Sequence, residues 1–198
     1  GKEGLTSYAK IGVVKEEDAI IAKGTSFSVW HNLKRAGMMT RARVGESEVE
    51  IEPADFVCDA ELNYYPPDYD RGARIRVVAG GPLRTTIEVH TRYYRVPVEA
   101  IEGRASDLAK KAAAPASNAR VKYRYTVVLG MPVTRVDAFM EQDSAKAWRE
   151  VEVCQFQSFD RHFQNWAMNI PSRLGGKTTG ILDKTGYWRQ GDRWAAVY

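Results

Sequence analysis

His31 is the residue with the clearest potential for chemistry, because it ends a β-favouring run at residues 24–31 and imidazole can act as a general base. Such a base needs a carboxylate to orient it, and Asp59 or Glu61 could supply one. A nucleophile beside free backbone N–H groups would complete the site. A histidine that follows a tryptophan at a strand end is, however, more often structural, and carboxylates are usually solvated. Both interpretations of His31 therefore stay open.

A glycine-bounded turn at residues 174–180 is the best place for the nucleophile, since glycines let the chain bend and point its amides at one atom. Thr178 is the first candidate in this turn, and Thr179 or Lys177 are the alternatives. The turn does not match a P-loop, because Pro171 stands where the first glycine is needed. Most such segments are simple turns, so this assignment depends on the neighbouring histidine and carboxylate.

Three segments of the first half resemble those of a known enzyme family. Residues 24–39, with the Trp-His pair, resemble the histidine strand of chymotrypsin-fold proteases of RNA viruses, of the flavivirus and potyvirus type. Residues 51–67 look like that family's aspartate strand, and residues 73–82 are similar to the strand that leads to its second barrel. The resemblance implies a two-barrel protease that cleaves a polyprotein.

By this resemblance His31 would be the general base and Asp59 the orienting carboxylate. The family places its nucleophile in a Gly-x-Ser-Gly or Gly-x-Cys-Gly turn, and this sequence contains neither. Thr178 then stands nearest to the nucleophile's position. The implied protein is a peptidase if it is an enzyme, or a protease fold that is inactive or altered at the nucleophile.

A second pattern places basic side chains at every other residue of several strands. The set comprises Arg41, Arg43, Arg74, Arg76, Arg120, Lys122 and Arg124. Alternation puts each group on one face of its strand, with Val121, Tyr123 and Tyr125 on the opposite face. If the strands are neighbours, they form a basic face that could bind the phosphate backbone of RNA. Alternating arginines also solvate the outer face of an ordinary antiparallel sheet.

Aromatic residues that could stack on bases accompany these strands. They are Tyr64, Tyr65, Tyr93, Tyr94, Trp188 and Trp194. The alternative to the protease is therefore a non-enzymatic RNA-binding or capsid-type β protein. The partner is a polypeptide substrate in the first case and RNA in the second, and a partner chain or a homo-oligomer is compatible with both.

The elements that must position these residues are mostly strands. Short β-favouring runs separated by turn residues predict a mainly β fold, with an α+β fold as second choice. We expect two small antiparallel β-barrels, or one barrel and a small α+β lobe. An alanine-rich helix or linker at 105–119 divides the N-terminal lobe, 1–104, from the C-terminal lobe, 120–198. Residues 135–150 are predicted to form a helix or a charged loop.

The composition is that of an ordinary globular protein and does not distinguish between the two candidate functions. The chain has 198 residues, 44% hydrophobic and 27% charged, with a net charge of +4. Cys58 and Cys154 form no CxxC pair, and the three histidines lack metal-ligand spacing, so we expect neither a metal nor a cofactor. No apolar window is long enough for a membrane span, and residues 1–10 contain no signal-peptide core. The expected location is the cytoplasm, that of the host cell if the protein is viral.

Overall fold

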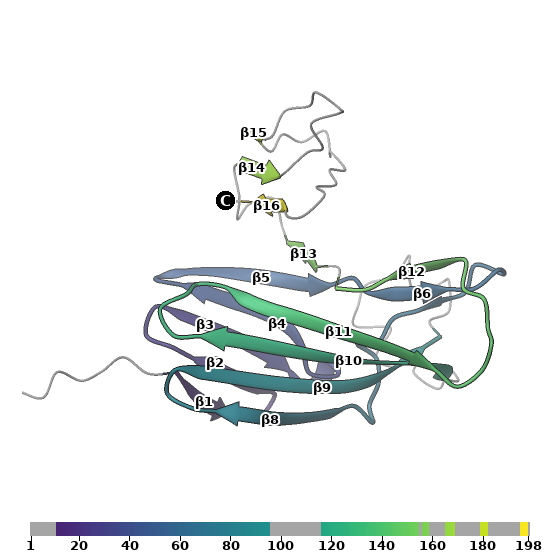
Figure 1. Ribbon diagram of the computed structural model, residues 1–198, viewed down its shortest axis with the longest axis horizontal. Helices are drawn as coiled ribbons and strands as arrows, with labels where there is room; N and C mark the ends of the chain where they lie inside the picture. Colours follow the sequence, from purple (N-terminus) through teal and green to yellow (C-terminus); the bar gives the residue numbers. More distant parts are fainter. Residues whose placement is uncertain are drawn as a thin grey trace, which may run out of the picture. The chain divides into compact units, whose positions relative to one another are not determined.

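The computed structural model describes residues 11–95 and 116–154, together with strands at 156–158, 165–168, 179–181 and 195–197. The chain divides into two compact units, Gly1–Gln157 and Ser158–Tyr198. Nearly all regular structure in the described residues is antiparallel β-sheet, and the single helical element there is a short 3-10 turn, η1 (Leu33–Arg35) (Figure 1). The prediction of a mainly β fold is confirmed.

The first large sheet has the strand order β1-β2-β3-β4-β5-β13. Its strands are β1 (Gly12–Lys15), β2 (Ala19–Lys23), β3 (Phe27–Asn32), β4 (Met38–Val44), β5 (Ser47–Pro53) and β13 (Phe156–Ser158). From β1 to β5, each strand pairs antiparallel with the next along the chain. Alternation along β3 directs Phe27, Val29 and His31 to one face, and all three are buried.

The second large sheet has the strand order β11-β10-β9-β8. Its strands are β8 (Arg74–Gly80), β9 (Arg84–Tyr94), β10 (Ala116–Val128) and β11 (Thr134–Gln142). A hairpin turn after Gly80 joins β8 to β9, with Gly80 opposite Thr85. Along β10 the residues Val121, Tyr123 and Tyr125 are buried, while the basic residues between them face outward. The alternation predicted for this strand is confirmed.

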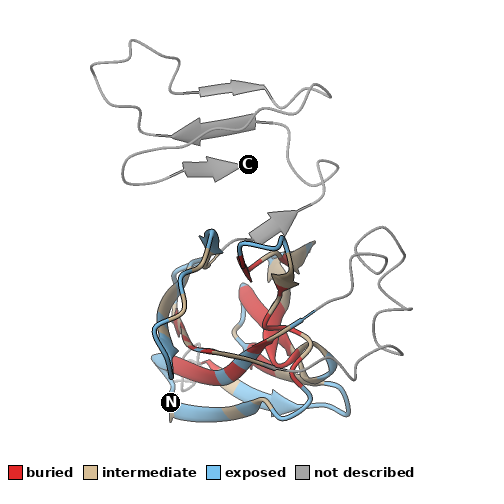
Figure 2. Cartoon of the chain, turned by 90° about the vertical axis from the view of Figure 1, so that its right-hand side faces the viewer, coloured by how far each residue is buried: buried red, intermediate tan, exposed pale blue. Residues whose placement is uncertain are grey.

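The core of the first unit lies between these two sheets, where the buried segments face each other (Figure 2). Val29 and Met38 come from the first sheet, and Ile87, Val89 and Tyr125 from the second. The Tyr125 hydroxyl donates to Met38 Sδ at 3.7 Å, which ties the sheets together at one point. Burial of each large apolar side chain stabilises the fold by roughly 1.5–3 kcal/mol relative to its exposure.

Two smaller sheets complete the described structure. The first unit also contains the order β12-β6-β7, formed by β12 (Glu150–Glu152), β6 (Phe56–Cys58) and β7 (Tyr64–Tyr65). The second unit has its own sheet in the order β15-β14-β16, formed by β14 (Asn165–Met168), β15 (Thr179–Ile181) and β16 (Ala195–Val197). Among the described residues, no helix combines the length and apolar character that a membrane crossing requires.

Three expectations about the architecture need correction. The described strands form open sheets rather than the predicted closed barrels. The predicted lobes 1–104 and 120–198 share one sheet, because β9 and β10 pair over most of their lengths. Residues 116–119 of the predicted helix or linker belong to β10, and residues 105–115 lie outside the described residues.

The segment 135–150, predicted as a helix or charged loop, begins within the nine-residue strand β11 (Thr134–Gln142), and residues 143–149 form a loop before β12. Its charges dominate the composition, but Val136, Ala138 and Met140 alternate and pack against the core. A period of two with apolar residues on one side is the pattern of a half-buried strand. Pairing with β10 along the whole strand explains why the helix does not form.

Gly37, just after η1, is expected to tolerate no side chain. Its φ is +77°, and an added Cβ would lie 2.2 Å from Ile75 Cδ1. We expect Gly37→Ala to lower the free energy of unfolding by about 2 kcal/mol, because a left-handed backbone and a steric overlap add together. Gly130→Ala is the matched control, since Gly130 has φ +76° and no atom near the added Cβ. Equal losses for both variants in urea unfolding would contradict the steric part.

Candidate functional site

His31 is a core residue of the first unit. Its side chain is fully buried, and its ring packs edge-on against Tyr125 with 4.6 Å between centroids. Nδ1 donates a hydrogen bond to the Gly37 carbonyl oxygen at 3.0 Å, and Nε2 has no hydrogen-bond partner among the described residues. Burial lowers the pKa of His31 to about 4, although the bond to Gly37 acts in the opposite direction. At neutral pH the imidazole is therefore uncharged and enclosed.

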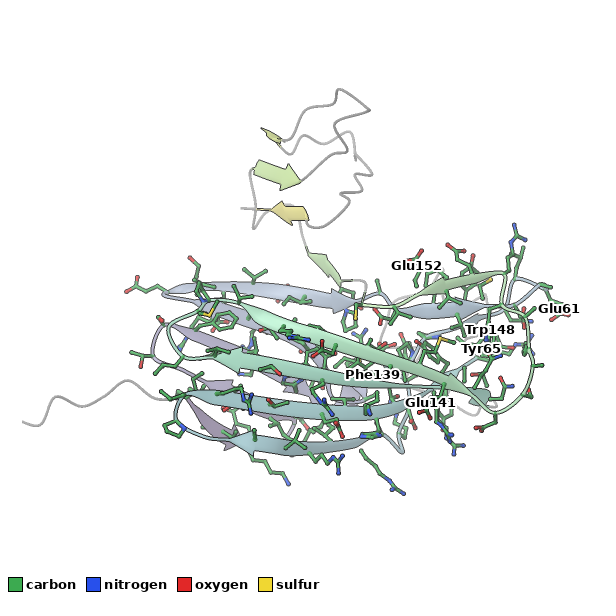
Figure 3. The ribbon with its side chains drawn as sticks, viewed as in Figure 1. Glu61, Tyr65, Phe139, Glu141, Trp148 and Glu152 are labelled. Carbon is green, nitrogen blue, oxygen red and sulfur yellow. The ribbon has the colours of Figure 1, made fainter. Side chains whose placement is uncertain are left out.

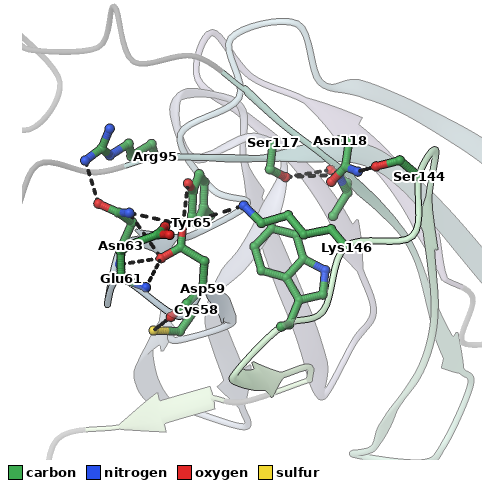
Figure 4. A network of polar contacts seen from close by, with 12 residues as sticks. Cys58, Asp59, Glu61, Asn63, Tyr65, Arg95, Ser117, Asn118, Ser144 and Lys146 are labelled. Atoms are coloured by element: carbon green, nitrogen blue, oxygen red, sulfur yellow. Dashed lines mark hydrogen bonds and ion pairs between the residues drawn. The ribbon is translucent and has the colours of Figure 1, made fainter.

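Asp59 closes the turn between β6 and β7 (Figure 4). Its carboxylate accepts hydrogen bonds from the Asn63 backbone N–H at 2.9 Å and the Tyr65 hydroxyl at 2.9 Å, and Lys146 Nζ lies 3.5 Å away. Burial favours the neutral acid, but the bonds from Asn63 and Tyr65 and the charge of Lys146 outweigh it. Together they hold the pKa of Asp59 well below its usual range. Asn63 and Tyr65 belong to the turn and to β7, whereas Lys146 comes from the segment between β11 and β12.

The predicted pair of His31 and Asp59 is not formed. His31 Nδ1 bonds to Gly37, and the hydrogen bonds of Asp59 come from its own turn. Glu61 contributes its backbone N–H to Asp59 at 3.1 Å, so it is part of the same turn. Thr178 and Lys177, the candidate nucleophiles of the glycine turn, lie outside the described residues. The physical reason for the missing pair is that β3 alternation sends His31 into the apolar core.

The basic strands form a more coherent arrangement, because β8 and β10 both flank β9. Arg120, Lys122 and Arg124 of β10 lie opposite Arg92, His90 and Glu88 of β9. Arg74 and Arg76 of β8 lie opposite His90 and Glu88 from the other side. We call this outer surface the basic face. It consists of Arg74, Arg76, His90, Arg92, Arg120, Lys122 and Arg124.

Arg41 and Arg43 do not belong to this face. They lie on β4 in the other large sheet, where their guanidinium carbons stand 4.3 and 5.9 Å from the ring centre of Trp30. Arg41 also forms an ion pair with Glu48 at 3.4 Å. The expectation that all seven predicted basic residues converge is therefore corrected to five of them.

Glu88 is the anchor at the centre of the basic face. Its side chain is 1% exposed, and it accepts bonds from Arg76 at 2.5 Å, His90 at 2.7 Å and Arg124 at 2.9 Å. The bond from His90 contributes most to lowering the pKa of Glu88 to about 2; burial opposes it, and both arginines reinforce it. The side chains of Arg76 and Arg124 remain 64% and 41% exposed. Glu88 thus fixes two cations that still face solvent.

A pocket of about 600 Å³ opens on the basic face beside this cluster. Its charged and aromatic lining includes Arg74, His90, Arg92, Arg120, Lys122 and Phe139. Within residues 11–95 and 116–154, Arg74, Arg92 and Lys122 form no ion pair, although the carboxylates of Asp70 and Glu141 line the same pocket. Such a concave surface with convergent cations is suited to binding an anion.

Sequence reasoning missed four residues of this site, namely Glu88, His90, Arg92 and Phe139. Three of them alternate along β9, and this period of two could have identified β9 as the strand between the two basic ones. Phe139 carried no such indication, because its segment was predicted as a helix or loop. Its place beside Lys122 follows only from the pairing of β10 with β11.

In the described part of the chain, the potential metal ligands form no cluster and the two cysteines form no disulfide. There, no three His, Cys, Asp or Glu side chains gather as a group that could hold a metal ion. Cys58 and Cys154 are free thiols, so they form no disulfide. Comparison of the chain with protein-family models, with curated proteins and with solved structures finds no match.

Proposed function

We propose that this protein is a non-enzymatic RNA-binding β protein, and that the basic face binds the phosphate backbone. The observation that carries the proposal is the convergence of Arg74, Arg92 and Lys122, which form no ion pair within the described residues, around one pocket. An exposed guanidinium group presents several N–H donors in a plane and matches the oxygens of a phosphate.

The sheet supports this binding by holding the cations at regular intervals. Residues that share a face of a strand are about 6.7 Å apart, and neighbouring strands about 4.8 Å apart. The cations of the basic face are therefore regularly spaced, because hydrogen-bonded strands rather than a loop position them. Electrostatic contacts of this kind dominate the affinity of proteins for nucleic acids and weaken steeply with salt.

The protease hypothesis lacks the geometry that it needs in the described residues. A general base must reach the proton that it removes, and His31 is enclosed in the core with Nδ1 bonded to Gly37. The carboxylate of Asp59 accepts hydrogen bonds from Asn63 and Tyr65 instead of from a histidine. Protease activity therefore stays a prediction from the sequence resemblance, and the basic face supports RNA binding better.

Two double variants with the same change in net charge test the proposal. Arg74→Gln with Arg92→Gln removes two cations of the basic face, and Arg41→Gln with Arg43→Gln removes two from the other large sheet. We expect the first to weaken binding of a fluorescent single-stranded RNA about tenfold or more, and the second to have little effect. The slope of log affinity against log salt should fall by roughly 1.4 in the first variant only, about 0.7 for each lost phosphate contact.

The measurement is fluorescence anisotropy between about 50 and about 200 mM salt. Thermal unfolding of both variants, followed by circular dichroism, shows whether the sheets remain intact. Equal losses of affinity in the two variants would mean that net charge, not the basic face, governs binding. An absence of RNA binding by the unmodified protein at the lowest salt concentration would overturn the proposed function.

A further inference from the structure

Phe139 lines the pocket on the basic face, where Tyr94 is the other aromatic lining residue; Figure 3 labels Phe139 together with Glu141. Phe139 lies on β11, and its residue is 47% exposed. Its neighbours in sequence, Ala138 and Met140, pack against the core, so alternation places Phe139 on the outer side. The core therefore does not require this ring. An exposed phenyl group beside cations in a pocket offers a face on which a flat ring of a ligand can stack.

The cations around Phe139 fall into two groups. Lys122 Nζ lies 4.7 Å from the ring centre and Arg124 Cζ lies 5.9 Å from it, so both are close enough for cation–π attraction. Arg74 and Arg92 line the same pocket and form no ion pair with any described residue. The pocket thus combines the ring of Phe139, and that of Tyr94, with two cations that form no ion pair within the described residues.

Arg120 differs from Arg74 and Arg92 because it is paired with carboxylates and therefore has a structural role. Its guanidinium bonds to Glu141 at 3.1 Å and to Asp143 at 3.1 Å, so its charge is already balanced. Glu141 also lines the pocket and limits how many negative charges can enter on that side. A ligand with a phosphate at one end and an aromatic ring at the other fits this division of charge.

We propose that the pocket is a subsite for one nucleotide of single-stranded RNA, with its base stacked on Phe139 and its phosphate bound by Arg74 and Arg92. This inference rests on the proposed function and adds the class of nucleic acid. The volume of about 600 Å³ lies within the range of pockets that enclose small organic ligands. Bases in a duplex are stacked and paired, so one would have to leave the helix to reach Phe139. The basic face should therefore prefer single strands.

Phe139→Leu is the informative variant, because leucine keeps an apolar side chain on β11 but has no aromatic face. The probe is a labelled RNA of mixed sequence without self-pairing, used alone or annealed to its complement. We expect the unmodified protein to bind the single strand roughly tenfold more tightly than the duplex. Phe139→Leu should lose most of this preference, with a salt slope that stays unchanged, and Phe139→Tyr should restore it.

The outcomes separate this inference from the function on which it rests. If RNA binds with a steep salt dependence, but equally as single strand and duplex and equally to Phe139→Leu, the subsite is refuted and the basic face stands. If neither RNA binds, the proposed function fails and the subsite fails with it. If Phe139→Tyr binds as weakly as Phe139→Leu, stacking on this ring is not the cause, and the subsite is again refuted.

Discussion

Asp55→Ala is expected to lower the free energy of unfolding by about 3–4 kcal/mol, the largest effect that we predict for a single substitution. Asp55 lies between β5 and β6 and is 2% exposed. Its carboxylate accepts a hydrogen bond from the hydroxyl of Tyr123 and one from the Cys154 backbone N–H, the latter at 2.8 Å. Alanine would leave both donors without this acceptor, and an unsatisfied buried donor costs about 1–3 kcal/mol.

Urea unfolding at neutral pH measures this loss, and two variants serve as controls. Glu46→Ala removes an exposed carboxylate in the turn between β4 and β5, and its stability should change by less than about 0.5 kcal/mol. Tyr123→Phe removes one of the two donors, so the double variant with Asp55→Ala should lose less than the sum of the single losses. A loss below about 1 kcal/mol in Asp55→Ala would show that neither bond matters to the fold.

Acid is expected to destabilise the protein through His31, by about 3 kcal/mol in total. The pKa of a free histidine is near 6.5, and burial lowers the pKa of His31 to about 4 in the folded protein. Between these two pKa values, His31 is therefore protonated in the unfolded chain and neutral in the folded protein. Above pH 6.5 the titration of His31 does not change the free energy of unfolding. As the pH falls from 6.5 to 4 the free energy of unfolding decreases, and below pH 4 the whole contribution of about 3 kcal/mol has been lost.

His31→Phe provides the comparison that isolates this titration. The variant loses the bond to Gly37 and is expected to be less stable at pH 7.5, yet it has no group to protonate at this position. The quantity to compare is the difference between the free energies of unfolding at pH 7.5 and pH 4.5. This difference should be larger in the unmodified protein by about 2.5 kcal/mol. Identical pH dependence in the two proteins would contradict the lowered pKa.

The sequence contained enough information to predict the local structure of most strands. The basic and aromatic residues of 120–125 alternate, and the structure separates them to the two faces of β10 as expected. The same period of two, applied to β3, places His31 on one face with Phe27 and Val29, and all three are buried. The sequence-based prediction did not use this alternation and left a catalytic and a structural His31 open.

The order of strands could not be derived from any local pattern. Arg41 and Arg74 both sit on short strands with alternating arginines, yet they belong to different sheets. Nothing in their neighbouring residues distinguishes them, because strand pairing depends on contacts between segments far apart in the chain. The candidate site depends on this pairing, since Phe139 meets Lys122 only through the register of β10 and β11. The sequence therefore predicted the alternation within single strands, but not the pocket that Arg74, Arg92 and Lys122 line.

The buried carboxylate of Glu88 also has a consequence for the conformational entropy of the arginines bonded to it. Long guanidinium side chains normally lose rotamer freedom when they grip a ligand, at a cost of about 0.5–1.5 kcal/mol for each immobilised side chain. Arg76 and Arg124 lose much of that freedom when the protein folds, because each is already bonded to Glu88. Under the proposed function, a strand of RNA that reached them would meet preorganised donors. Glu88 would then lower the entropic cost of binding an anion, although its own charge would repel one.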